Sequence, residues 1–151
     1  MKINVRSTGP NKVLMDRKEL KKANGDVFFE AWRMPEELFI RVNWIGIQTL
    51  ETVVMGGNQL LAMLREKPCR GILNSNRELI GPWESAVPYM AYKWAPTAEI
   101  LGLKYFAHVL SPGIFGQRSY EVFNQQLKGQ LRTRAFEMED QAMEWLNRHL
   151  D

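Results

Sequence analysis

The sequence has 151 residues, of which 45% are hydrophobic and 25% charged, with a formal net charge of +3. This length fits one domain with a full core, and this composition excludes a disordered chain and a membrane-embedded one. The single cysteine, Cys69, excludes an intramolecular disulfide. Because no basic start followed by an apolar run indicates a secretory signal either, we expect a cytoplasmic protein with no membrane span.

The basic residues gather in the first part of the chain. Residues 1–22 hold seven basic side chains against two acidic ones, a local charge of +5, which leaves −2 for the remaining 129 residues. Such a run is usually a solvated face, and its alternative role is contact with phosphate or an acidic partner. We divide the chain into a basic segment, 1–25, in which Val13-Leu14-Met15 could add an edge strand, and a single α/β domain, 26–151. Nothing in the domain indicates nucleic-acid binding.

A β-hairpin is expected at the start of the domain. The Asn24-Gly25 turn signal precedes residues 27–33, which are rich in β-branched and aromatic side chains and predict a strand. After a second turn at 34–37, apolar and polar residues alternate with the period of a strand. The side chains predicted to face the core are Leu38, Ile40, Val42 and Trp44.

A helix and a buried strand follow the hairpin. Apolar residues recur at helical spacing from Leu50 to Leu64, Thr49 can cap the helix, and Pro68 requires it to end near Lys67. Residues 69–74 then predict a short buried strand. The result is a βαβ crossover, which is right-handed in about 98% of cases.

The second half alternates helices and strands. Residues 81–102 predict a helix broken or kinked near Pro96, and 104–110 predict a central strand. Ser119 is expected to cap a helix that ends at Gly129, and 131–136 predict another strand. The last helix has a predicted inward face of Met138, Ala142, Trp145, Leu146 and His149. These elements predict an α/β domain with a mixed sheet of about five strands.

Polar residues follow two predicted strands, and ligands of open parallel sheets collect beyond such carboxyl ends. The candidate ligand or partner pocket combines them with two tryptophans of the broken helix and the mid-strand histidine: Asn74, Ser75, Asn76, Arg77, Trp83, Trp94, His108 and Ser111. In the alternative interpretation, the asparagines satisfy turn backbone, Arg77 pairs with a nearby glutamate, and His108 is a hydrogen-bonded structural residue.

Signatures of catalysis and of metal or cofactor binding are missing from the sequence. One cysteine and two distant histidines do not provide the compact ligand set of a zinc site. The chain has no Gly-x-Ser-x-Gly sequence, and its glycines do not match the phosphate-binding motifs. We therefore expect no metal, no cofactor and no catalytic residue.

Several short stretches resemble the SpoIIAA-like family of bacterial proteins, whose fold is of the STAS type. They are Val42-Asn43-Trp44-Ile45-Gly46, Ile72-Leu73-Asn74-Ser75-Asn76-Arg77, Trp94-Ala95-Pro96, Gly102-Leu103-Lys104-Tyr105-Phe106-Ala107 and Ala142-Met143-Glu144-Trp145-Leu146. The resemblance covers roughly residues 27–150 and implies an N-terminal hairpin followed by alternating helices and parallel strands. Its motifs are packing and turn signatures, so they indicate the fold and do not indicate a function.

Phosphorylated anti-sigma-factor antagonists of this fold carry a serine or threonine after an aspartate, in Asp-Ser-Ser-Gly or a close variant. Residues 74–85 occupy that region and contain no such tetrapeptide. Ser75 and Ser85 are thus candidate phosphosites by position alone, and a phosphate on Ser85 would lie near a helix N-terminus.

Three functions are weighed. The first is a non-catalytic binding or regulatory module that acts through protein contacts, with itself as a homodimer or with another protein. The second, suggested by related lipid-transfer domains, is a carrier of a small apolar or lipid-like ligand, which requires an enclosed pocket. The third is an enzyme using Arg77 and His108, which requires both side chains to reach one cleft.

Overall fold

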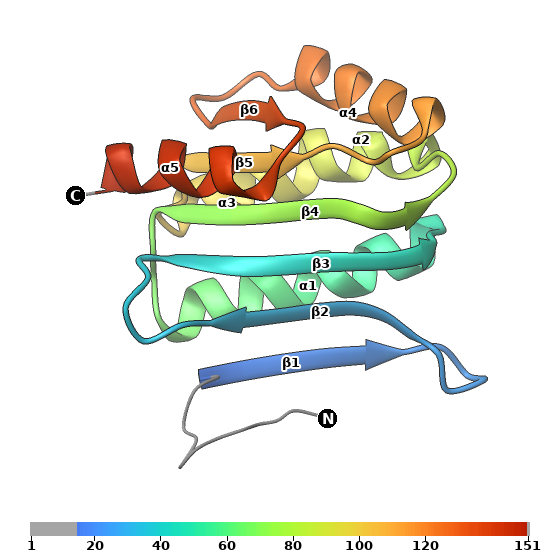
Figure 1. The fold of residues 1–151 in the computed structure, drawn as a ribbon, viewed down its shortest axis with the longest axis horizontal. Helices are drawn as coiled ribbons and strands as arrows, with labels where there is room; N and C mark the ends of the chain where they lie inside the picture. The colour runs from blue at the N-terminus through green and yellow to red at the C-terminus, as the bar shows by residue number, and fades with distance from the viewer. Residues whose placement is uncertain (1–14, 151) are drawn as a thin grey trace.

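A six-stranded mixed sheet with the strand order β1-β2-β3-β4-β5-β6 organises the protein (Figure 1). The computed structural model describes residues 15–150, with side chains from residue 17. The strands are β1 (Met15–Lys21), β2 (Val27–Arg33), β3 (Phe39–Ile47), β4 (Gly71–Ile80), β5 (Tyr105–Val109) and β6 (Arg132–Phe136). The helices are α1 (Leu50–Glu66), α2 (Val87–Tyr89), α3 (Ala95–Ile100), α4 (Ile114–Gln126) and α5 (Glu139–Leu150).

The strand pairing confirms the predicted hairpin and the parallel strands that follow it. β1, β2 and β3 pair in antiparallel fashion, whereas β3 to β6 are parallel. Each parallel strand is added on the same side of the one before it. Because such crossovers are right-handed, α1, α2–α3 and α4 all lie on one face of the sheet, and α5 covers the other (Figure 1).

β1 adds a sixth strand, one more than the sequence predicts. The expected edge strand at Val13-Leu14-Met15 lies outside the described residues except for its last member, where β1 begins. β1 is highly charged, and its pairing with β2 is irregular at two points. Five of the seven residues of β1 are charged, so the strand lacks the apolar alternation by which strands are recognised.

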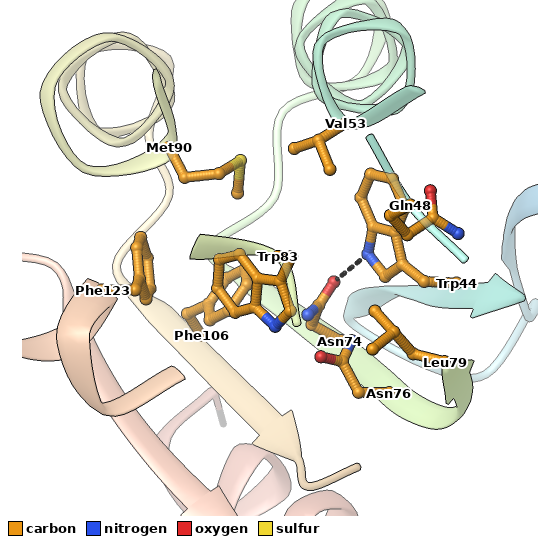
Figure 2. Close-up of a pocket in the computed structure, with 10 residues that line it drawn as sticks. All are labelled: Trp44, Gln48, Val53, Asn74, Asn76, Leu79, Trp83, Met90, Phe106 and Phe123. Carbon is orange, nitrogen blue, oxygen red and sulfur yellow. Dashed lines mark hydrogen bonds between the residues drawn. The ribbon is translucent and has the colours of Figure 1, made fainter. Parts of the chain in front are cut away.

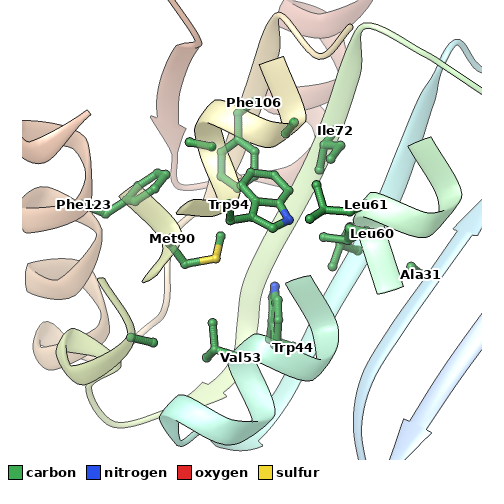
Figure 3. Packing of buried hydrophobic residues seen from close by; sticks show 14 of the residues in the cluster. Ala31, Trp44, Val53, Leu60, Leu61, Ile72, Met90, Trp94, Phe106 and Phe123 are labelled. Carbon is green, nitrogen blue, oxygen red and sulfur yellow. The ribbon is translucent and has the colours of Figure 1, made fainter. Parts of the chain in front are cut away.

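The main core lies between the sheet and α1 to α4 (Figure 3). Thr49 and Thr52 form a capping box at the start of α1, and the helix ends at Glu66, as predicted. Two consecutive glycines let this helix pack closely, Gly56 against the sheet and Gly57 against α2. A Cβ atom on Gly56 would clash with the ring of Trp44, and one on Gly57 would lie 2.7 Å from the Tyr89 hydroxyl.

A smaller core lies under α5. Its buried members are Phe39, Leu73, Ala107, Val109, Ala142, Trp145, Leu146 and Leu150. The prediction that Leu38 faces the core was wrong: β3 begins at Phe39, which is buried, and Leu38 is 55% exposed. β3 is covered on both faces at this point, so one-sided alternation does not describe it.

The segment between β4 and β5 is a broken helix, but it breaks before Pro96. A 3₁₀ turn, η1 (Glu84–Ala86), leads into α2, and a π-helical turn, η2 (Met90–Trp94), leads into α3. The Ala95 amide donates to the Met90 carbonyl, five residues back. The next residue, Pro96, has no amide hydrogen, and the wider turn before it accommodates its ring.

Several boundaries differ from the sequence prediction. β4 continues to Ile80 instead of ending at Asn74, and α4 runs from Ile114 to Gln126 instead of from Ser119 to Gly129. Ser119 lies in mid-helix, where its hydroxyl accepts from the Trp83 amide and donates to the Phe115 carbonyl. The prediction that Met138 faces inward was wrong, because Met138 precedes α5 and is 54% exposed. Across residues 15–150, none of the helices has both the length and the apolar character needed to cross a membrane.

Candidate functional site

The middle of β4 distributes the candidate residues over both faces of the sheet. The prediction that Asn74 to Arg77 form a loop beyond a strand end was wrong, because all four lie within β4. Asn74 and Asn76 face the main core, whereas Ser75 and Arg77 line a surface depression on the α5 side. An irregularity in the β3–β4 register follows Ser75.

A buried polar relay links β3, β4 and β5. The Trp44 indole Nε1 donates to Asn74 Oδ1 at 2.8 Å, and Asn74 Nδ2 lies 3.2 Å from His108 Nδ1. Because an indole N–H can only donate, it fixes the Asn74 amide with its oxygen toward Trp44 and its NH₂ toward His108. Nδ1 of His108 therefore accepts, and the proton of the neutral ring is on Nε2.

Three buried polar atoms beside this relay have no hydrogen-bond partner: Asn76 Oδ1, Trp83 Nε1 and His108 Nε2. Among the other side chains of the described residues, only Gln126 Oε1 is also buried without a hydrogen-bond partner. An unsatisfied buried polar group costs about 1–3 kcal/mol, and such groups are few in native proteins. Their concentration at one place marks a site that the packing alone does not explain.

A small cavity of about 20 Å³ adjoins two of these atoms (Figure 2). Its lining comprises Trp44, Gln48, Val53, Asn74, Asn76, Leu79, Trp83, Met90, Phe106 and Phe123. None of these side chains is ionisable. Figure 2 shows the Trp83 indole nitrogen and the Asn76 amide oxygen turned toward each other, with Met90 of the π-helical turn among the apolar lining.

His108 is a neutral structural histidine. It is 1% exposed, and its ring stacks on Tyr120 of α4 with the centroids 4.3 Å apart. Burial lowers its pKa from 6.5 to about 3, because the charged form would lose its hydration. Arg77 is exposed and donates to the Glu137 carbonyl on the α5 side. The two side chains required by the enzyme hypothesis therefore do not share a cleft.

The other candidates have separate environments. Ser75 is buried, and its Oγ accepts from the Arg77 amide, whereas Ser85 is exposed in η1. Trp94 donates to the Gly57 carbonyl within the main core, and Ser111 Oγ accepts from the Gly113 amide before α4. Of the eight predicted pocket residues, the structure thus brings together Asn74, Asn76, Trp83 and His108.

Sequence reasoning missed the polar contributions of Trp44 and Gln48. Alternation alone assigns Trp44 to the core, and no sequence pattern gives an assignment for Gln48. Gln48 is 6% exposed, and its NH₂ donates to the carbonyls of Phe28 and Ile45. A tryptophan at a core position of a strand carries one signal that could have been used, since its N–H requires a buried acceptor.

Exposed apolar side chains surround the carboxyl ends of the parallel strands. We call this set the rim: Ile47, Leu50, Ile80, Ile114 and Phe115, each between 48% and 61% exposed. Ile47 and Ile80 are paired neighbours that end β3 and β4. The others lie at the starts of α1 and α4, at the same end of the sheet (Figure 1). The rim holds five of the ten exposed large hydrophobic residues in the described chain.

Neither a protein-family model nor a curated protein matches this chain. Within residues 15–150 there is also no group of three or more histidine, cysteine, aspartate or glutamate side chains arranged to hold a metal ion. The rim and the polar cavity are the candidate sites in the part of the chain that the structure describes.

Proposed function

We propose that this chain is a non-catalytic binding module of SpoIIAA-like, STAS-type fold that acts through protein contacts at the rim. The observation that supports this proposal is the concentration of exposed apolar side chains at one end of the sheet. Single exposed hydrophobic residues are ordinary, whereas a contiguous group rimmed by polar residues is typical of an interaction surface. The carboxyl ends of parallel strands are also the usual location of binding sites in open α/β sheets.

The apolar character of the rim specifies the chemistry of the partner. Charged residues of both signs lie near it in the chain: Glu51, Glu78 and Glu84, the exposed Arg77 and Arg118, and the half-buried Lys22, whose Nζ donates to the Ile47 carbonyl. An apolar surface bordered by charges of both signs complements an amphipathic helix through the apolar stripe of that helix. We take such a helix as the partner.

The small volume of the core cavity argues against the carrier hypothesis. A pocket for a drug-sized ligand occupies about 300–1,000 Å³. The cavity at the aromatic segment measures about 20 Å³, and the surrounding aromatic side chains pack against one another. A lipid-like ligand would have to displace several of them, so we do not retain this function.

The experiment measures binding of a fluorescent leucine–lysine amphipathic peptide of about 18 residues, long enough to form a helix on binding. Fluorescence anisotropy is recorded with the wild-type protein, with Ile80→Asn at the rim, and with Ile100→Asn as the matched control. Ile100 is 85% exposed and ends α3, at the opposite end of the sheet. Loss of one buried isoleucine contact removes about 1.5–3 kcal/mol, so Ile80→Asn should weaken binding about tenfold or more.

Two results would overturn this proposal. One is binding no tighter than that of a scrambled peptide with the same composition, and the other is equal weakening by both variants. Sedimentation of the free protein provides a further test. A dimer that Ile80→Asn dissociates would assign the rim to a second copy of the chain instead of to a helical partner.

A further inference from the structure

The polar cavity differs from the rim in chemistry and in accessibility. Its two polar atoms without partners belong to side chains that are more than nine-tenths buried, with exposures of 2% for Asn76 and 8% for Trp83. One is an acceptor, the amide oxygen of Asn76, and the other is a donor, the indole N–H of Trp83. No direct hydrogen bond joins them.

The size and charge of the cavity define what can bind there. A water molecule needs about 10–15 Å³ of this kind of space and two to four polar partners. The cavity offers about 20 Å³ and the two atoms just described. Because its lining contains no ionisable side chain, it provides no counter-charge for an ion. Its apolar walls include Val53, Met90 and Phe106.

We infer that this cavity is a specific binding site for one water molecule, which accepts a hydrogen bond from Trp83 Nε1 and donates one to Asn76 Oδ1. This water links β4 to the chain segment that follows it. The backbone of Trp83 is already attached to α4, because its amide donates to Ser119 Oγ. With the water bound, the indole is attached to β4 as well. The segment that directly follows Ile80 of the rim is then held from two sides.

Nuclear magnetic resonance tests this inference on the wild-type protein, with Trp94 as an internal control. In a water-selective NOE experiment, the indole protons of Trp83 and Trp94 are compared. Both rings are buried, but Trp94 donates to the Gly57 carbonyl and does not line the cavity. We expect a cross-peak to a long-lived water at Trp83 and none at Trp94. The inference is overturned by the lack of a water cross-peak at Trp83, or by equal cross-peaks at both indoles.

Two variants give a second test. Asn76→Leu removes the acceptor and fills the cavity, so the Trp83 water cross-peak should disappear. Asn76→Ser keeps a hydroxyl acceptor and should retain it, and this variant keeps the test valid if the leucine variant does not fold. Asn147→Leu, at an exposed position of α5, controls for the introduction of a leucine. A cross-peak that persists in folded Asn76→Leu would show that the water lies elsewhere.

Discussion

Replacing Asn74 with leucine should destabilise the protein by removing the centre of the buried relay. The substitution keeps the branched shape of the side chain but leaves two groups without partners, Trp44 Nε1–H and His108 Nδ1. Each such group costs about 1–3 kcal/mol, and full burial of the leucine recovers about 1.5–3 kcal/mol. We therefore expect a net loss of about 2 kcal/mol, a substantial part of the 5–15 kcal/mol by which domains are usually stable.

Urea unfolding followed by far-ultraviolet circular dichroism measures this loss without relying on tryptophan fluorescence. Asn43→Leu is the matched control, because Asn43 donates to Glu78 on the other, solvent-facing side of the sheet. It should cost less than about 1 kcal/mol. Trp44→Phe completes a double-mutant cycle, in which the combined loss with Asn74→Leu should be smaller than the sum of the two single losses. Additive losses, or equal losses for Asn74→Leu and Asn43→Leu, would refute the relay.

Two further predictions concern His108 and Gly56. The unfolded chain binds a proton at His108 near pH 6.5, whereas the native state does so only near pH 3. Stability should therefore fall by about 1.4 kcal/mol per pH unit as the pH drops from 6.5 toward 3, and His108→Phe should flatten this slope between pH 6.5 and 5 in urea unfolding. If the pH dependence of stability were the same in His108→Phe as in the wild type, His108 would not be the cause of the loss of stability at low pH. Gly56→Ala places a methyl group against the Trp44 ring. It should cost about 1–3 kcal/mol despite the better helix propensity of alanine, whereas Met55→Ala at an exposed position should be nearly neutral in thermal unfolding. A stabilised Gly56→Ala protein would show that the helix can move away from β3.

The fold could be predicted wherever local pattern and tertiary environment agree. The bounds of β2, 27–33, and the end of α1 before Pro68 follow from sequence signals alone. β4 could not be predicted in full, because Asn74-Ser75-Asn76-Arg77 has the composition of a turn. Its amides are tolerated in a central strand because Trp44 and His108, distant in sequence, supply hydrogen-bond partners for Asn74. The start of α4 was missed because Gly113 provides no capping side chain.

The candidate site was predicted in part for the wrong reason. Asn74 and Asn76 were selected as loop residues beyond a strand end, and they converge with Trp83 because they are inside the strand and point into the core. Arg77 was selected with them, but the alternation of a strand turns it to the opposite face. The rim was not predicted, because exposure of residues such as Ile80 and Phe115 depends on which helices cover which part of the sheet.

The two edges of the sheet limit how copies of this protein can associate. β1 carries Arg17, Lys18, Glu19 and Lys21, and β6 carries Arg132 and Arg134. Charged side chains along an open edge oppose the docking of a foreign strand, which is the usual route to domain swapping and to fibrous aggregates. Growth of the sheet by backbone pairing is therefore opposed at both edges, so contacts between copies of this chain are directed to its other surfaces.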